Sequence, residues 1–215
     1  MVGRATMSPM TTTSEPRWRR LEPDERREQI FTCAARLFGE RPYALVSTSD
    51  IAAEAGVARG LINHYFGTKR QLYLAVIRRA VTMPALDGHT PLDGPLSDRA
   101  DVTVEKFLDM VLSQGKMWLV ATSEGIGQDA EVEEILVEAE RRSADRVLDA
   151  FGVPADAEAR PQLNALMRSF AGMVKAAGRE WLLRKELDRG QVHTLLYHTL
   201  VTMLENVFPP LLKTE

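Results

Sequence analysis

The chain has 215 residues, of which 45% are hydrophobic and 27% charged, an ordinary composition for a globular protein of one or two domains. Its single cysteine, Cys33, excludes an intrachain disulfide and indicates a reducing compartment. No apolar run approaches the roughly 18 residues that span a bilayer. Residues 1–16 also lack the apolar core of a signal peptide, so we expect a cytoplasmic protein with no membrane partner.

The net charge of −3 is unevenly distributed. Residues 1–80 contain 13 Lys and Arg against 8 Asp and Glu, a net charge of +5, whereas residues 81–215 contain 14 against 22, a net charge of −8. Phosphates would attract the first part and repel the second. Residues 1–20, which are rich in Thr, Ser and Pro, are interpreted as a disordered basic tail. The alternative is an arm that contacts DNA.

Helical patterns begin at Pro23. Apolar residues recur at helical spacing over Pro23–Phe38 and predict the first helix. Ser47, followed three residues later by Asp50, forms a pattern that caps the start of a second helix. Gly56 can adopt the positive φ of a sharp turn, so the second helix is expected to end there.

Two further helices follow this turn. The third is predicted from about Ala58 to Tyr65, and it is compact and carries several polar side chains. Thr68 and Gln71 repeat the capping pattern and predict a connecting helix over 69–82. Two short helices joined by a tight turn are a helix-turn-helix, so residues 21–68 are predicted to form a three-helix DNA-binding domain.

The acidic part of the chain also has helical periodicity. Residues 83–95 contain three prolines and two glycines and are predicted to be a linker. Apolar stripes then predict four long helices, which run through residues 104–120, 132–151, 163–181 and 192–207. We expect Gly190 to separate the last two and Pro209-Pro210 to stop the last. Because no useful β alternation is present, the predicted fold class is all-α, with residues 96–215 forming a second helical domain.

Residues near the N-terminus of the third helix point to base recognition. Arg59 can donate two hydrogen bonds to guanine, and Asn63, one turn later on the same face, can pair with adenine. Gly60 between them lets the backbone approach DNA closely. Phosphate contacts are expected from the adjacent polar residues and from the starts of the second and fourth helices. The predicted DNA-binding residues are Ser47, Thr48, Arg59, Gly60, Asn63, His64, Tyr65, Thr68 and Lys69.

Apolar and small residues surround this motif in a dense pattern. They are Ile30, Ala34, Leu37, Phe38, Thr48, Ile51, Ala52, Ala55, Gly56, Val57, Gly60, Ile62, Tyr65, Phe66, Lys69 and Leu72. Through them, residues from about Arg26 to Arg79 resemble the DNA-binding domain of TetR-family transcriptional regulators. Asn63, where the family often has tyrosine, and Ala58, where it often has serine or threonine, depart from the family pattern.

The resemblance implies a homodimer that binds a palindromic double-stranded DNA operator and usually represses. It also implies a small-molecule effector, which we expect to be apolar or aromatic. Candidate residues for its pocket are Phe107, Met110, Met117, Trp118, Met167, Phe170 and Met173, for each of which plain core packing is the alternative. The apolar stripes of the last two long helices favour dimerisation through a four-helix bundle.

Two other classes of function are alternatives to DNA binding. Catalysis is disfavoured because His193 and His198 do not share a helix face and no phosphate-binding loop, zinc motif or nucleophile elbow is present. No catalytic residue, metal or cofactor is therefore predicted. The second alternative is an adaptor whose helix-turn-helix contacts protein, against which the polar residues Arg59, Asn63 and Lys69 argue.

Overall fold

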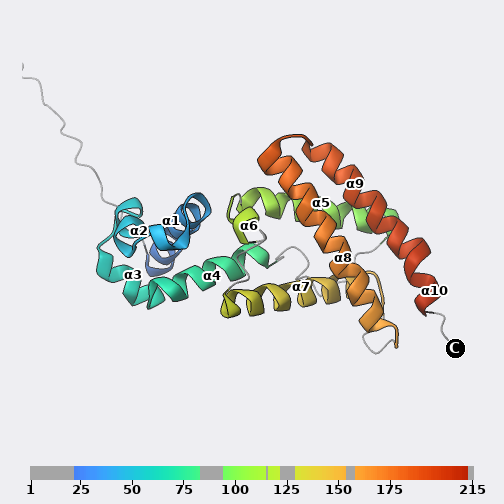
Figure 1. Ribbon diagram of the computed structural model, residues 1–215, viewed down its shortest axis with the longest axis horizontal. Coiled ribbons are helices and arrows are strands. Elements are labelled where there is room, and N and C mark those ends of the chain that lie inside the picture. Colours follow the sequence, from blue (N-terminus) through green and yellow to red (C-terminus); the bar gives the residue numbers. More distant parts are fainter. Residues whose placement is uncertain (1–21, 83–93, 115, 122–128, 154–157, 213–215) are drawn as a thin grey trace, which may run out of the picture.

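The computed structural model describes an assembly of helices (Figure 1). The described residues are 22–82, 94–114, 116–121, 129–153 and 158–212. None of these residues forms a strand, so the predicted all-α class is confirmed. The predicted tail, residues 1–20, lies outside the described residues, as does most of the predicted linker, residues 83–95.

Four α-helices and one 3-10 turn form the N-terminal part. They are α1 (Pro23–Glu40), η1 (Tyr43–Leu45), α2 (Thr48–Glu54), α3 (Arg59–Phe66) and α4 (Lys69–Val81). The four α-helices meet in one core, in which Ile30, Ile51, Ile62 and Leu72 are fully buried. These helices agree with the predicted ones to within about two residues at each end, the usual uncertainty of a helix boundary.

Longer helices form the C-terminal part. They are α5 (Leu96–Gln114), α6 (Lys116–Ala121), α7 (Ala130–Ala150), α8 (Arg160–Arg179), the π-helical turn η4 (Glu180–Arg184), α9 (Arg189–Thr202), the π-helical turn η5 (Met203–Val207) and α10 (Phe208–Leu212). α5 packs against α9, and α7 packs against both α4 and α8. Within the described residues, no helix combines the length and the apolar character needed to cross a membrane.

Three predicted features of these helices were wrong. The helix predicted over 104–120 is divided into α5 and α6. Gly190 lies inside the first turn of α9, where backbone N–H groups have no helical partner, and the preceding break occurs at Lys185 with φ +63°. Pro209 and Pro210 do not stop the helix but are the second and third residues of α10, which follows η5 directly. The Phe208 N–H before them still donates to Met203 O, and the prolines themselves have no N–H to donate.

The N-terminal and C-terminal parts are in direct contact. Met117 of α6 and Val132 and Ile135 of α7 belong to the same buried cluster as α1 and α4. A second cluster joins α5, α8 and α9. Gly178 of α8 allows this helix to approach α6, because a Cβ at that position would lie 2.5 Å from Cζ3 of Trp118. α6 and α7 therefore connect the interior of the helical bundle to the helices that carry the candidate site.

Candidate nucleic-acid interface

The turn between α2 and α3 is set by backbone hydrogen bonds around Gly56. Its N–H donates to Ala53 O at 3.2 Å, and the N–H of Val57 donates to Ala52 O at 3.0 Å, which is the Schellman pattern of a helix C-terminus. Gly56 itself has φ +61°, a conformation that costs glycine little and other residues more. The predicted turn is confirmed, and it fixes the direction in which α3 leaves α2.

The N-terminal half of α3 faces solvent. Arg59, Gly60, Asn63 and His64 are all exposed, whereas Tyr65 is half-buried against the core. The His64 and Tyr65 rings meet edge to face with centroids 5.1 Å apart. The structure thus brings five of the predicted DNA-binding residues together along one short helix.

Arg59 is held in place by the first residue of α2. Its Nε donates to Oγ1 of Thr48 at 3.1 Å, which links two predicted site residues that are 11 positions apart. This bond uses Nε and leaves both terminal amino groups of the guanidinium for another acceptor. The two terminal amino groups, which are the donors predicted to recognise guanine, therefore stay available.

Capping boxes occupy the two helix starts predicted to contact phosphate. The N–H of Asp50 donates to Ser47 Oγ at 3.1 Å, and the N–H of Ser47 donates back to the Asp50 carboxylate at 2.8 Å. The backbone and hydroxyl hydrogen bonds from Ser47 lower the pKa of Asp50. Thr68 and Gln71 form the same reciprocal pair at α4, with distances of 3.1 and 2.8 Å. Both predicted capping boxes are confirmed, and both hydroxyls already have an internal role.

Lys69 has a structural role that its sequence position did not reveal. Its ammonium donates to the backbone carbonyls of Tyr43 and Val46, both at 2.9 Å, and lies 4.0 Å from the centre of the Tyr43 ring. It therefore joins α4 to η1 and to the segment that leads into α2. An ammonium has a third donor, so phosphate contact by Lys69 stays a prediction, but most of its bonding capacity is directed inward.

Ion pairs use part of the positive charge of the N-terminal half. Arg36 of α1 pairs with Glu40 and with Glu54 of α2. Arg79 of α4 pairs with Glu28 of α1 at 2.7 Å, and this contact lowers the pKa of Glu28. These arginines brace the helices against one another. The positive charge directed at a partner is therefore smaller than the residue counts alone indicate.

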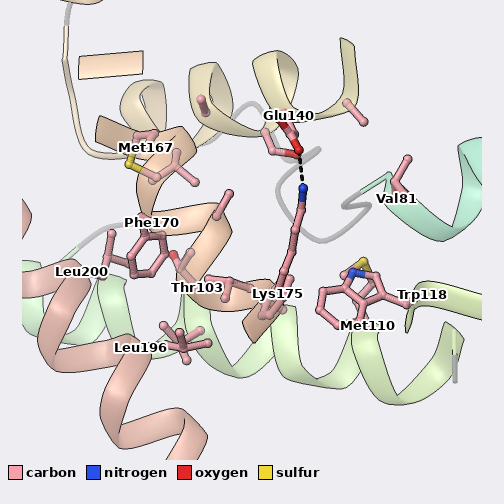
Figure 2. Close-up of a pocket in the computed structure, with 18 of the residues that line it drawn as sticks. Val81, Thr103, Met110, Trp118, Glu140, Met167, Phe170, Lys175, Leu196 and Leu200 are labelled. Atoms are coloured by element: carbon pink, nitrogen blue, oxygen red, sulfur yellow. Dashed lines mark hydrogen bonds and ion pairs between the residues drawn. The ribbon is translucent and has the colours of Figure 1, made fainter. Parts of the chain in front are cut away.

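A mostly apolar cavity lies inside the C-terminal helices (Figure 2). Its volume is about 130 Å³. Of the predicted pocket residues, the five that line it are Phe107, Met110, Trp118, Met167 and Phe170. Met117 and Met173 do not line it. Met117 is buried toward α1 and α4, and Met173 packs against the second core cluster without reaching the cavity. That this cavity holds an effector stays a prediction.

Sequence reasoning missed the polar residues of this cavity. Glu140 and Ser143 of α7 and Lys175 of α8 contribute to its wall, and Lys175 forms an ion pair with Glu140. Periodicity could have placed Glu140 and Ser143 on one side of α7, since they are three residues apart. The pairing of Glu140 with Lys175, 35 residues later, has no sequence signal. Among the described residues, no group of three or more His, Cys, Asp or Glu could hold a metal ion.

Comparison with known proteins identifies the family. The model described as bacterial regulatory proteins of the tetR family matches residues 30–76, and the model described as the tetracyclin repressor-like C-terminal domain matches residues 96–203. The chain belongs to the TetR family. Both halves are accounted for, and the family is one of transcriptional regulators rather than enzymes.

Similar curated proteins match a short part of this TetR-family chain. The transcriptional activator FasR of Mycolicibacterium smegmatis is 40% identical over 65 residues, which are 30% of each chain. The transcriptional regulator BetI of Agrobacterium fabrum is 47% identical over 53 residues, 25% of this chain and 26% of that protein. The chain thus spans less than a third of the length of the curated relatives it matches.

Solved structures extend the likeness to the whole fold. A tetR-family transcriptional regulator from Streptomyces coelicolor superimposes with a TM-score of 0.67 at 23% identity, over 90% of this chain and 89% of that one. The fatty acid degradation regulator FadR from Bacillus halodurans has a TM-score of 0.62 at 15% identity, over 87% and 97% of the two chains. At these identities the likeness shows the fold alone.

Proposed function

We propose that this TetR-family protein is a sequence-specific DNA-binding repressor that acts as a dimer and is released from a palindromic operator by a small molecule. The observation that carries the proposal is the exposed N-terminal half of α3. Arg59 and Asn63 face solvent there, while Ile62 on the inner side is fully buried and holds the helix in the core. A recognition helix needs this combination of free polar residues and a rigid base.

The contacts we propose follow from the chemistry of each side chain. Arg59 reads guanine with its two terminal amino groups, and Asn63 reads adenine. Gly60 brings the backbone of α3 close to the bases. The remaining predicted residues position the domain by contacting phosphates, and they are Ser47, Thr48, His64, Tyr65, Thr68 and Lys69. Lys69 also holds η1 and the segment after it in place, through the carbonyls of Tyr43 and Val46.

The exposed sides of α8 and α9 support a dimer. Ala165, Gly172 and Ala176 are exposed on one side of α8 and leave room for a partner helix to approach closely. Leu183 after α8 and Leu195 of α9 are large apolar residues with 67% and 40% of their surface exposed. Two such helix pairs would bury these surfaces in a four-helix bundle. The two copies of α3 would then reach successive major grooves, one helical turn of DNA apart.

We propose that α7 transmits effector binding to the DNA-binding domain. Glu140 and Ser143 of α7 line the cavity, while Asp129 and Glu131 at its N-terminus both accept hydrogen bonds from Arg70 of α4. These bonds measure 2.5 and 2.8 Å. An effector that displaces α7 would act on α4, and through its first turn on α2 and α3. The separation of the two α3 helices in the dimer would change accordingly.

Selection of bound sequences from a random DNA pool tests the proposal directly. We expect a palindrome with half-sites about 10 base pairs apart, or a multiple of this spacing, and an affinity that falls steeply with salt. Sedimentation should show a dimer at micromolar concentration. A monomer, or the absence of any enriched sequence, would contradict the proposal, and a salt-insensitive protein partner without DNA retention would favour an adaptor.

Substitution of Arg59 tests whether α3 recognises bases through this residue. Arg59→Ala should weaken operator binding by about 1–3 kcal/mol and relax the preference at one base pair in each half-site. Arg142→Ala is the matched control, because Arg142 lies on the exposed surface of α7 away from α3. Equal affinity of the two variants would remove Arg59 from the set of base-reading residues. Since the relative FasR is named an activator, a promoter fusion with and without the protein distinguishes repression from activation.

A further inference from the structure

The cavity between α5, α6, α7, α8 and α9, to which Val81 of α4 also contributes, has a balanced charge. Its wall is apolar apart from a few side chains, and the only charged residues among those that line it in the described chain are Glu140 and Lys175. These two pair with each other, and Figure 2 shows the Lys175 side chain reaching from α8 toward Glu140 on α7. Their side chains are only 31% and 28% exposed. The cavity therefore presents a neutral ion pair that is largely withdrawn from water.

We infer that the effector is an uncharged, small aromatic molecule with one hydroxyl or carbonyl group, held by Ser143 and the Glu140–Lys175 pair. The inference rests on the proposed function, in which this cavity is the effector site. A charged ligand would have to displace one member of the pair and leave the other without its partner, a costly state for a shielded charge. An uncharged ligand leaves the pair intact.

The size and lining of the cavity favour a single aromatic ring. A volume of about 130 Å³ is close to that of engineered cavities that bind benzene, which are about 150 Å³. Phe107 and Trp118 line the cavity with centroids 6.1 Å apart and planes at 75°, an edge-to-face pair that a third ring can extend. Phe170 and Trp118 are labelled on either side of Lys175 in the view of Figure 2, and all three residues line the cavity.

Ser143 supplies the polar contact that the ligand needs. It lies one turn after Glu140 on α7, lines the cavity and is only partly exposed. Its hydroxyl has no hydrogen-bond partner among the described residues, whereas the Thr103 hydroxyl, also in the wall, already donates to Arg99 O at 2.7 Å. A ligand hydroxyl or carbonyl would complete the bonding of Ser143 and could also meet the donors of Lys175. These groups orient a molecule that the apolar wall alone would hold loosely.

Three probes with one carbon skeleton and a single ring test the inference: benzyl alcohol, benzoate and protonated benzylamine. Binding is measured at pH 7 by calorimetry on the full-length protein, together with release of the selected operator. We expect the alcohol to bind at least about tenfold more tightly than either ion, since each ion must disrupt the pair. Ser143→Ala should weaken the alcohol several-fold and leave the two ions unchanged.

Variants of Glu140 and Lys175 should change which of the three probes binds most tightly. Glu140→Gln frees Lys175 and should make the carboxylate the tightest ligand, whereas Lys175→Met frees Glu140 and should favour the amine. Glu138→Gln is the matched control, because Glu138 lies on α7 in an exposed cluster with Arg141 and Arg142 and does not line the cavity. It should keep the wild-type order. The order of the three affinities in the wild-type protein tests the inference even if a variant does not fold.

The possible results separate the inference from the proposed function. If an ion binds the wild-type protein most tightly, or if no probe binds, the inference is overturned. If the alcohol binds in the expected order but leaves operator binding unchanged, the ligand class stands and the proposed release mechanism fails. If the alcohol binds in this order and releases the operator, both are supported.

Discussion

Gly60→Ala should make the protein more stable and a weaker DNA binder. Gly60 is the second residue of α3, it is exposed, and a Cβ built on it meets no heavy atom within 4 Å. Its φ is not positive, so alanine fits the backbone without strain. The free energy of unfolding should rise by about 0.5–1 kcal/mol, because alanine restricts the unfolded chain and favours the helix. This corresponds to an increase of roughly 1–4 °C in Tm for a chain of this length.

The added methyl group should have the opposite effect on the complex. Gly60 lies beside Arg59 and one turn before Asn63, so in the proposed complex its Cα faces the groove that these residues read. An extra methylene in a tightly packed interface costs about 1–3 kcal/mol, which lowers affinity about 5- to 150-fold. Stability and affinity then change in opposite directions, which separates loss of contact from loss of fold.

Urea denaturation and fluorescence anisotropy with the selected operator at fixed salt measure the two quantities. Gly67→Ala is the contrasting variant, because Gly67 has φ +73° and a Cβ there would lie 2.1 Å from Oε1 of Gln71. It should lower stability, and any loss of binding should accompany unfolding. An unchanged operator affinity for Gly60→Ala would refute the close approach of α3 to DNA, and a destabilised variant would refute the description of open space at this position.

Three further outcomes are expected. Lys69→Met should lower the free energy of unfolding by about 2–3 kcal/mol in urea denaturation, because two backbone carbonyls lose a charged donor; weaker operator binding at unchanged stability would instead indicate direct phosphate contact. Gly178→Ala should be destabilising by about 1–2 kcal/mol and alter the fluorescence of Trp118, since overpacking outweighs the gain in helix propensity. Arg70→Ala should leave ligand binding unchanged in calorimetry but diminish operator release several-fold, and full release would argue against transmission through α7.

Features that depend on neighbours in sequence were predictable. The capping boxes at Ser47 and Thr68 and the turn at Gly56 are local, because their hydrogen bonds join residues no more than five positions apart. The positions at which helices are interrupted were harder to predict from the sequence. Gly190 and the Pro209-Pro210 pair usually break helices, yet here each lies in a first turn, where neither a strong helix former nor a backbone donor is required.

Features that depend on distant partners could not be predicted from the pattern. Lys69 was predicted to contact phosphate at a helix start, and the structure shows that it also binds carbonyls 23 and 26 residues earlier in the chain. Met117 shared the apolar pattern of its neighbour Trp118, although the two side chains point into different clusters. Periodicity assigns a residue to a buried side of a helix. It does not say which of two cores that side meets when a short helix such as α6 lies between them.

Because α6 and α7 lie between the two buried clusters, each of them contacts both the cavity and the N-terminal helices. Trp118 of α6 lines the cavity, and the adjacent Met117 packs against α1 and α4. α7 lines the cavity through Glu140 and, about three turns earlier, binds Arg70 through Asp129. A closely packed interior transmits displacement because it cannot absorb added volume. A ligand that displaces α6 or α7 would therefore act on the domain that carries α3, because both helices contact it.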